Sequence, residues 1–342
     1  MTQDHPRIVE PRWICPTWAE PGAALRVGII GLDIRADYPA LVLSGHKQSW
    51  KLAILEPPQG PGETPTWLTA AMPADVGAGL YTLRLTAGDA RCEMPHCVAV
   101  PRAVKESFSF VHLSDSHLLK AGGGELKDRT PAIRQVARRV NELRPDFAIH
   151  TGDLISRYDG QKRPVDEALI WRQMQAAREL LLELEVPLFV TPGNHDTGYP
   201  SARDAWREFM GAAWHGGTDD FSFDFGGYHF SVLERICRYD PVSDEVADCA
   251  LLPAQKAWLV RDMAAAADAK GRFLFTHYDY DGALAEMLKE LPIDVVFYGH
   301  SAKRCLPVPE LLDGHLASGH AWRVVTIDGQ GISSRLGPRY EP

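Results

Sequence analysis

The order of hydrophobic and polar residues changes about one third of the way along the chain. Up to residue 104, short segments alternate polar and apolar positions, are rich in β-branched and aromatic residues, and are separated by turn-forming clusters such as PPQGPGETP. The best examples are residues 18–34, 49–57 and 77–88. No amphipathic helical spacing stands out in this part, and the pattern predicts short β-strands joined by turns.

From residue 107 onwards, buried-strand patterns alternate with helical ones. Apolar residues recur at helical spacing over 131–145, 168–185, 254–267 and 283–291. Between these segments lie short apolar runs that are typical of buried strands, at 108–113, 146–153, 186–196, 228–234, 272–277 and 294–300. Strands and helices that alternate over more than 200 residues predict a layered α/β domain.

These two rhythms predict two domains. The chain has 342 residues, and domains usually hold roughly 100–200 residues. We expect an N-terminal all-β domain at 1–104, of a size that fits an immunoglobulin-like sandwich, and a larger α/β domain at 105–342. The smaller domain carries no evident chemistry, so its expected role is packing or substrate access.

Composition and charge narrow the classes of function. Hydrophobic residues make up 45% and charged residues 24% of the chain, as in ordinary globular proteins. The formal net charge is −9, with 36 basic and 45 acidic residues, which argues against nucleic acid as the main partner. A small phosphorylated substrate remains compatible with this charge, because a bound metal supplies local positive charge.

The termini and the cysteines indicate the compartment. MTQDHPRIVEPRW lacks a basic start followed by an apolar run, so we expect no signal peptide, and no stretch approaches the roughly 20 apolar residues of a membrane span. The six cysteines form no CxxC pair; free thiols are favoured over a bridge between Cys92 and Cys97. We therefore expect a cytoplasmic protein. Its oligomeric state is left open.

Side chains that can bind metal follow several of the predicted strands. Five segments end in such residues: VHLSDSH, IHTGD, FVTPGNHD, FLFTH and VFYGH. The residues are Asp115, His117, Asp153, Asn194, His195, Asp196, His277 and His300. Ligands of open α/β sheets bind outside the carboxyl ends of strands, so these five ends are expected to converge. Carboxylates, imidazoles and an amide oxygen suit hard or borderline divalent ions.

Taken together and in this order, these stretches resemble the calcineurin-like metallophosphoesterase family, whose pattern is DxH, GD, GNH followed by Asp or Glu, a separate His, and GHxH. The resemblance covers roughly residues 108–330 and implies a β-sandwich flanked by helices. It also implies two divalent ions, manganese, iron or zinc. One ion would be held by Asp115, His117 and Asp153, and the other by Asp153, Asn194, His277 and His300.

One family ligand is missing from this sequence. The last position of GHxH, which binds the first ion in the family, is Ala302 here. A water or substrate oxygen can fill such a gap, or His315 or His320 can reach in from the next strand end, with His320 the better placed. The alternative is that His320 is an ordinary surface residue.

The resemblance also implies a reaction. Two ions about 3.5–4 Å apart clamp a phosphate and generate a metal-bound hydroxide that attacks phosphorus. His195 resembles the residue that stabilises the transition state or protonates the leaving group, and Asp196 resembles its orienting partner. We expect a phosphohydrolase, with a phosphodiester favoured over a phosphomonoester. The alternatives are a mononuclear or atypical metalloenzyme, and a non-catalytic scaffold that has lost full metal occupancy.

Overall fold

The computed structural model describes residues 6–31, 38–59, 65–102, 107–122, 125–158, 164–211, 218–234, 236–240, 245–277, 283–300, 311–313, 322–329 and 331–336. The chain divides into two compact units. The first comprises Met1–Val104, Glu185–Phe189 and Gly211–Gly216, and the second comprises Lys105–Leu184, Val190–Met210 and Gly217–Pro342. The two-domain boundary after residue 104 stays a prediction.

The first unit contains strands and no helix among its described N-terminal residues. Its strands are β1 (Arg7–Glu10), β2 (Thr17–Trp18), β3 (Ala24–Ile30), β4 (Ala40–Ser44), β5 (Ser49–Leu52), β6 (Ile54–Gln59), β7 (Thr66–Ala71), β8 (Gly79–Ala87) and β9 (Ala90–Val100). They form a four-stranded sheet in the order β1-β3-β7-β6 and a five-stranded sheet in the order β2-β9-β8-β4-β5.

Both sheets of this unit bury residues in one hydrophobic core. Val27 and Leu68 come from the first sheet, and Leu43 and Leu83 come from the second. In β7 and β8 buried residues alternate with more exposed ones, as the alternating sequence pattern predicted. The all-β character is confirmed for the described residues, whereas the immunoglobulin-like topology stays a prediction. Cys92 and Cys97 are free thiols, as predicted.

The second unit contains most of the remaining elements, except that Leu188 and Phe189 of β14 and Gly211 of η1 belong to the first unit. Its strands are β10 (Phe108–Leu113), β11 (Leu119–Gly122), β12 (Glu125–Asp128), β13 (Phe147–His150), β14 (Leu188–Val190), β15 (Phe221–Phe225), β16 (Tyr228–Leu233), β17 (Ile236–Asp240), β18 (Glu245–Ala250), β19 (Arg272–Thr276), β20 (Val295–Tyr298), β21 (Leu311–Asp313), β22 (Arg323–Asp328) and β23 (Gly331–Leu336). Its helices are α1 (Thr130–Leu143), α2 (Glu167–Leu181), α3 (Asn194–Thr197), α4 (Pro200–Trp206), the π-helical turn η1 (Arg207–Gly211), α5 (Pro253–Ala265) and α6 (Ala283–Glu290).

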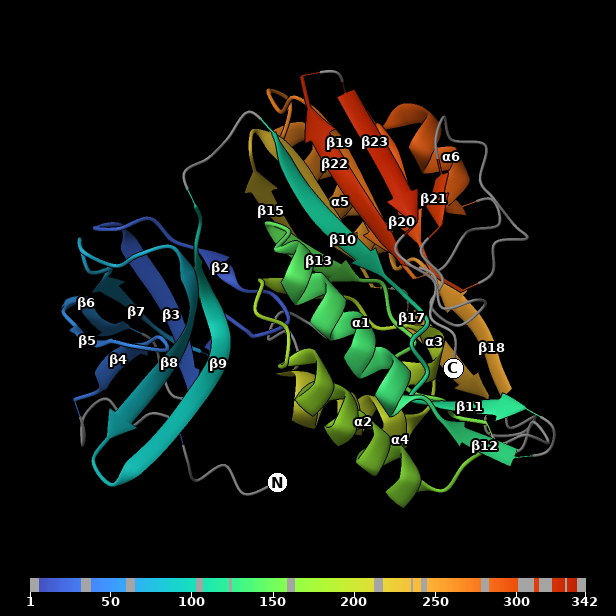
Figure 1. The fold of residues 1–342 in the computed structure, drawn as a ribbon, viewed down its shortest axis with the longest axis horizontal. Helices are drawn as coiled ribbons and strands as arrows, with labels where there is room; N and C mark the ends of the chain where they lie inside the picture. The colour runs from blue at the N-terminus through green and yellow to red at the C-terminus, as the bar shows by residue number, and fades with distance from the viewer. Residues whose placement is uncertain are drawn as a thin grey trace. The chain divides into compact units, whose positions relative to one another are not determined.

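Two five-stranded sheets form the centre of this unit, in the orders β14-β13-β10-β22-β23 and β15-β16-β19-β20-β21 (Figure 1). Phenylalanines join them: the ring of Phe110 on β10 lies 5.9 Å from that of Phe230 on β16 and 5.5 Å from that of Phe297 on β20, and Phe147 lies 5.2 Å from Phe230. Aromatic packing of this kind makes the two sheets a sandwich with a continuous core.

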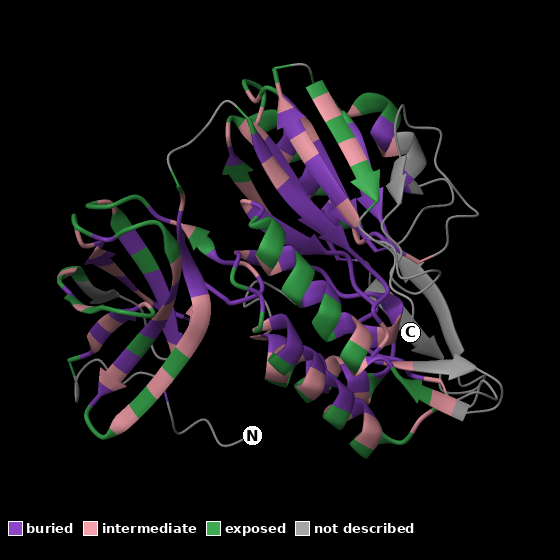
Figure 2. Cartoon of the chain, viewed as in Figure 1, coloured by how far each residue is buried: buried purple, intermediate pink, exposed green. Residues whose placement is uncertain are grey.

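Helices cover the sandwich. Helices α5 and α6 share a hydrophobic cluster with β19 and β20, in which Leu259 and Leu284 pack with Leu274. Helices α1 and α2 are neighbours, and α1 buries one face through Ile133, Val136, Ala137 and Val140 (Figure 1). Figure 2 shows the central strands largely buried and exposed residues on the outer side of α1. The predicted layered α/β arrangement is therefore present.

The long helices and the core strands lie where the sequence predicted them, within a few residues at each end. The predicted strand at 186–196 is shorter: β14 ends at Val190, and Asn194–Thr197 form the short helix α3. The hairpins β11–β12 and β17–β18 and the helix α4 were not predicted. None of the helices among the described residues is long and apolar enough to cross a membrane.

Candidate metal and phosphate site

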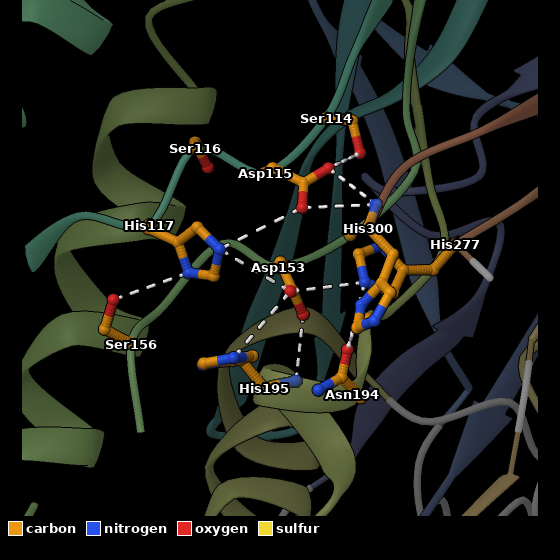
Figure 3. Close-up of polar contacts among 12 residues, drawn as sticks. Ser114, Asp115, Ser116, His117, Asp153, Ser156, Asn194, His195, His277 and His300 are labelled. Atoms are coloured by element: carbon orange, nitrogen blue, oxygen red, sulfur yellow. Dashed lines mark hydrogen bonds and ion pairs between the residues drawn. The ribbon is translucent and has the colours of Figure 1, made fainter. Parts of the chain in front are cut away.

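The strand ends converge at the same edge of the second unit. Strands β10 and β13 run parallel, as do β19 and β20, so their carboxyl ends point the same way. Figure 3 shows that the side chains that follow these strands face one another: Asp115, His117, Asp153, Asn194, His195, His277 and His300. The convergence that the sequence predicted is therefore present.

Asp153 lies at the centre of this group and is 2% exposed. Its Oδ2 atom lies 3.6 Å from Nε2 of His117, 3.2 Å from Nε2 of His277 and 4.0 Å from Nε2 of His195. Two groups of three potential ligands share it: one with His117 and His195, the other with His277 and His300. A carboxylate common to two groups is what a bridge between two ions requires.

The second group has the spacing of a metal coordination shell. Oδ1 of Asn194 lies 3.1 Å from Nε2 of His277 and 3.0 Å from Nδ1 of His300. Ligand atoms bound at about 2.0–2.2 Å in adjacent positions lie about 3 Å from each other. The donor set, a carboxylate, an amide oxygen and two imidazoles, suits a divalent cation.

The charge state of His277 supports the same fit. Burial lowers the pKa of His277, but the charge of Asp153 and its hydrogen bond to that carboxylate outweigh burial and raise the pKa to about 9. In turn, burial raises the pKa of Asp153, yet His277 and His195 outweigh this and hold the pKa well below its usual range. Without a bound cation, the centre thus holds a positive charge on His277 next to the Asp153 carboxylate.

Asp115 lies beside both groups. Its Oδ1 is 4.0 Å from Nε2 of His117. The hydroxyl of Ser114 donates to its Oδ2 at 2.6 Å, and the backbone N–H of His300 donates to both carboxylate oxygens at 3.2 and 3.0 Å. Asp115 therefore ties the end of β20 to the end of β10.

The backbone of this site is strained where the predicted ligands stand. Positive φ angles occur at Asp115 (52°), His117 (41°), Asp153 (56°) and His300 (67°), among only six such non-glycine residues in the described chain. Non-glycine residues in the left-handed region are unfavourable and persist where the surrounding structure imposes them, often at functional sites.

Motif glycines allow the loops to approach one another. A Cβ atom on Gly152 would collide with the backbone of Gly193, and a Cβ atom on Gly193 would collide with Asp153. At Gly299 it would meet the Ser114 hydroxyl and Asp115. The glycines that precede Asp153, Asn194 and His300 are therefore needed for contact between loops, in addition to any turn preference.

The partner of Nδ1 distinguishes His195 from His117 and His277. Nδ1 of His117 lies 3.0 Å from the carbonyl oxygen of Ile155, and Nδ1 of His277 lies 2.6 Å from that of Thr151. A carbonyl can only accept, so both Nδ1 atoms carry hydrogen, which leaves Nε2 as the nitrogen that faces Asp153 and that can bind a metal ion once it has lost its hydrogen. At His195 the polarity is opposite: the backbone N–H of Arg157 donates to Nδ1 at 3.2 Å.

The orienting role predicted for Asp196 is not what the structure shows. Its Oδ1 accepts the backbone N–H groups of Leu154 and Ile155 at 2.9 and 3.2 Å, and its Oδ2 accepts that of Gly193 at 2.9 Å. His195 takes its ring contact from Arg157 instead. Among the described residues both carboxylate oxygens of Asp196 bond backbone N–H groups and neither contacts the His195 ring, so a catalytic role of Asp196 stays a prediction. Asp196 is fully buried, and burial together with the charge of Asp153 raises its pKa.

Arg157 is a functional candidate that the sequence reasoning missed. It is 5% exposed, and its guanidinium carbon lies 4.7 Å from the ring centre of Tyr158 and 4.9 Å from that of Tyr199. Its Nη1 donates to the carbonyl of Asn194 at 3.1 Å, and its buried Nε has no hydrogen-bond partner among the described residues. An arginine four residues after Asp153 was the available sequence signal.

Part of the predicted site lies outside the described residues. Ala302, His315 and His320 belong to this part, so the question of what replaces the missing ligand stays open. The assignment of individual metal ligands likewise stays a prediction, which the geometry of the described residues fits.

Comparisons with known proteins agree with this site. The calcineurin-like phosphoesterase family model matches residues 108–304. The mouse serine/threonine-protein phosphatase CPPED1 is 28% identical over 281 residues, covering 68% of this chain and 85% of that protein. Its human counterpart is 30% identical over 251 residues, 63% of this chain and 75% of that protein.

A solved structure of PhoD aligns with a TM-score of 0.50 over 98% of this chain and 88% of that one, at 10% sequence identity. At this identity the likeness concerns the fold alone. The family match spans more than half of the chain and includes every strand end that carries a predicted ligand. The chain belongs to the calcineurin-like phosphoesterase family and is a phosphoric ester hydrolase.

Proposed function

We propose that the protein is a metal-dependent phosphatase that hydrolyses phosphomonoesters at the Asp153 centre. The observation that carries this proposal is the position of one buried carboxylate within reach of two sets of imidazole ligands. When bound, two divalent ions supply Lewis acidity toward the phosphate and lower the pKa of the attacking water. The Nε2 atoms of His117 and His277, together with Asp153, Asn194 and His300, would hold them.

His195 and Arg157 would act on the phosphate itself. Burial lowers the pKa of His195 to about 3 against the opposing charge of Asp153, so the ring is neutral in the metal-free site. Because Nδ1 accepts from Arg157, the hydrogen of the neutral ring is on Nε2, where it can be donated to a phosphate or leaving-group oxygen. The guanidinium of Arg157 offers further N–H donors to an anion, and its planar geometry suits phosphate.

The choice of monoester over diester rests on two observations. The relatives are named serine/threonine-protein phosphatases, and a buried arginine beside His195 favours the doubly charged monoester. The preference for a phosphodiester, drawn from the family resemblance, remains the second candidate. A small phosphorylated substrate in place of nucleic acid remains a proposal that the net charge of −9 is compatible with. A cytoplasmic location also remains a proposal, supported by the free thiols of Cys92 and Cys97.

A direct substrate comparison tests this function. Purified protein loaded with manganese is assayed with p-nitrophenyl phosphate and with bis(p-nitrophenyl) phosphate under identical conditions. We expect the monoester to have the higher kcat/KM, and we expect Arg157→Met to reduce it more for the monoester than for the diester. A higher kcat/KM for the diester would overturn the substrate assignment, and no hydrolysis of either compound would overturn the proposed function.

A further inference from the structure

The loop Asp153–Arg157 contacts two histidines of the site through its backbone. One buried side chain of α2 forms two hydrogen bonds to the backbone of this loop. Gln173 is 4% exposed. Its Oε1 accepts the backbone N–H of Ser156 at 2.9 Å, and its Nε2 donates to the backbone carbonyl of Ser156 at 2.9 Å. Both polar groups of Gln173 are therefore used on one loop residue, and neither touches a predicted ligand.

Each of these two bonds fixes a different peptide plane. The N–H of Ser156 shares a planar peptide unit with the carbonyl of Ile155, and the carbonyl of Ser156 shares one with the N–H of Arg157. In a trans peptide the N–H and the C=O point in opposite directions. A hydrogen bond to one polar group of a peptide plane therefore also fixes the direction of the other polar group of that plane.

The groups oriented in this way, the carbonyl of Ile155 and the N–H of Arg157, are the ones that contact the two histidines. The carbonyl of Ile155 accepts from Nδ1 of His117 at 3.0 Å, and the N–H of Arg157 donates to Nδ1 of His195 at 3.2 Å. These two rings lie next to each other, with centres 4.7 Å apart. A carbonyl places the hydrogen of a neutral imidazole on Nδ1, whereas an N–H donor places it on Nε2.

We propose that Gln173 is a positioning residue that sets opposite tautomers on His117 and His195 by holding the two peptide planes on either side of Ser156. His117 thereby presents a lone pair at Nε2 and acts as a metal ligand. His195 presents an N–H at Nε2 and acts as a donor to the phosphate. Although His195 lies within ligand distance of Asp153 and His117, its tautomer makes it a donor.

Alternative anchors for this loop leave the same two planes free. Asp196 holds the N–H groups of Leu154 and Ile155, which belong to the preceding planes. The hydroxyl of Ser156 donates to the carbonyl of Leu119, and its oxygen lies 3.4 Å from Nδ1 of His117, where it can accept the same hydrogen as the Ile155 carbonyl. These contacts restrain the Ser156 side chain but not its peptide groups. Among the contacts of the described residues, Gln173 is thus the side chain that holds both planes.

The first test reads the tautomers directly in the metal-free protein. Nitrogen-15 spectra of histidine-labelled protein distinguish a protonated from an unprotonated ring nitrogen, and the His117→Ala and His195→Ala variants assign the two signals. In the wild type we expect the hydrogen on Nδ1 of His117 and on Nε2 of His195. Gln173→Met, which fills the same space without hydrogen bonds, is expected to convert both signals to tautomer mixtures.

The second test rests on the proposed function and uses the manganese-loaded enzyme. A good leaving group such as p-nitrophenolate departs without a proton, whereas an alkoxide requires one. In Gln173→Met we expect kcat for an alkyl phosphate to fall at least about 10-fold more than kcat for p-nitrophenyl phosphate. The matched control is Gln175→Leu, because Gln175 is an exposed residue of the same helix that bonds only Glu179; it is expected to match the wild type.

Gln173→Glu covers the case in which Gln173→Met does not fold. At pH 9, where the introduced carboxyl is ionised, it still accepts from Ser156 N–H but can no longer donate to the Ser156 carbonyl. We expect the His195 signal to change and the His117 signal to persist. Wild-type tautomers in the folded Gln173 variants, or equal loss of kcat for both substrates, would overturn the inference. A wild type that hydrolyses neither substrate would instead overturn the proposed function, and the spectra would still test Gln173.

Discussion

Two clusters of histidine and aspartate in the second unit have similar composition and different uses. In the first, Nε2 atoms of His117 and His277 face the shared carboxylate of Asp153, while their Nδ1 atoms bond backbone carbonyls. In the second, which joins β15, β16 and α5, His229 lies 2.7 Å from Asp224 through Nδ1 and 3.0 Å from Asp262 through Nε2.

The two clusters differ in whether hydrogen bonds within the cluster occupy both nitrogens of its histidine. In the second cluster both ring nitrogens of His229 bond carboxylates, and the hydroxyls of Ser222 and Ser231 donate to the two oxygens of Asp262. In the first, Nε2 of His117 and Nε2 of His277 both face the carboxylate of Asp153, and the backbone at the predicted ligands is strained. Residue types alone therefore do not identify a metal site; the partner of each second nitrogen does.

The largest expected effect separates the two clusters by their aspartates. Asp153→Asn removes the shared carboxylate, and we expect activity to fall by more than about 100-fold. This loss exceeds the roughly 10–100-fold that is typical when a residue hydrogen-bonded to a metal ligand is replaced. Asp262→Asn serves as the matched control and is expected to change activity less than about 2-fold while lowering stability. Hydrolysis of p-nitrophenyl phosphate measures both. Comparable activity of the two variants would contradict the assignment of different roles to Asp153 and Asp262.

The next effect separates donor from ligand within the first cluster. His195→Ala should lower kcat for an alkyl phosphate about 10²–10⁴-fold, the usual range for a lost general acid, without changing the metal content. His117→Ala should lower the metal content as well. Elemental analysis and kinetics on the same samples check this pair. Metal loss in His195→Ala equal to that in His117→Ala would make His195 a ligand.

The smallest effect concerns stability and pH at His229. Burial lowers the pKa of His229, but its hydrogen bonds to Asp262 and Asp224 outweigh this and raise the pKa above its ordinary value. A raised pKa stabilises the folded state below the unfolded value of about 6.5, and this stabilisation is lost as pH rises through the folded value.

His229→Gln should therefore lower the free energy of unfolding by about 1–2 kcal/mol at pH 5.5–6. The difference from wild type should shrink as pH rises, and activity should be unchanged. Urea denaturation across this pH range measures it. A difference that grows with pH would contradict the charged state of His229.

The sequence predicted the strand ends of the site well, because most of the predicted ligands follow closely after a short buried strand whose apolar pattern is clear, although Asn194 begins the helix α3. It also predicted the helices, since Ile133 and Val136 recur at helical spacing. What it missed depends on contacts between distant segments. Nothing local connects Gln173 with Ser156 or directs Asp196 to the backbone of Leu154, although a polar residue on the apolar face of a helix, as at Gln173, was a usable signal.

The proposed function requires that the Asp153 carboxylate bind two metal ions. Elemental analysis of the purified protein after incubation with manganese, iron or zinc, compared with Asp153→Asn treated identically, tests it most directly. We expect two ions per wild-type chain and a clear loss of bound metal in the variant. Equal metal content in the two proteins, or active wild-type protein that binds no metal, would contradict it.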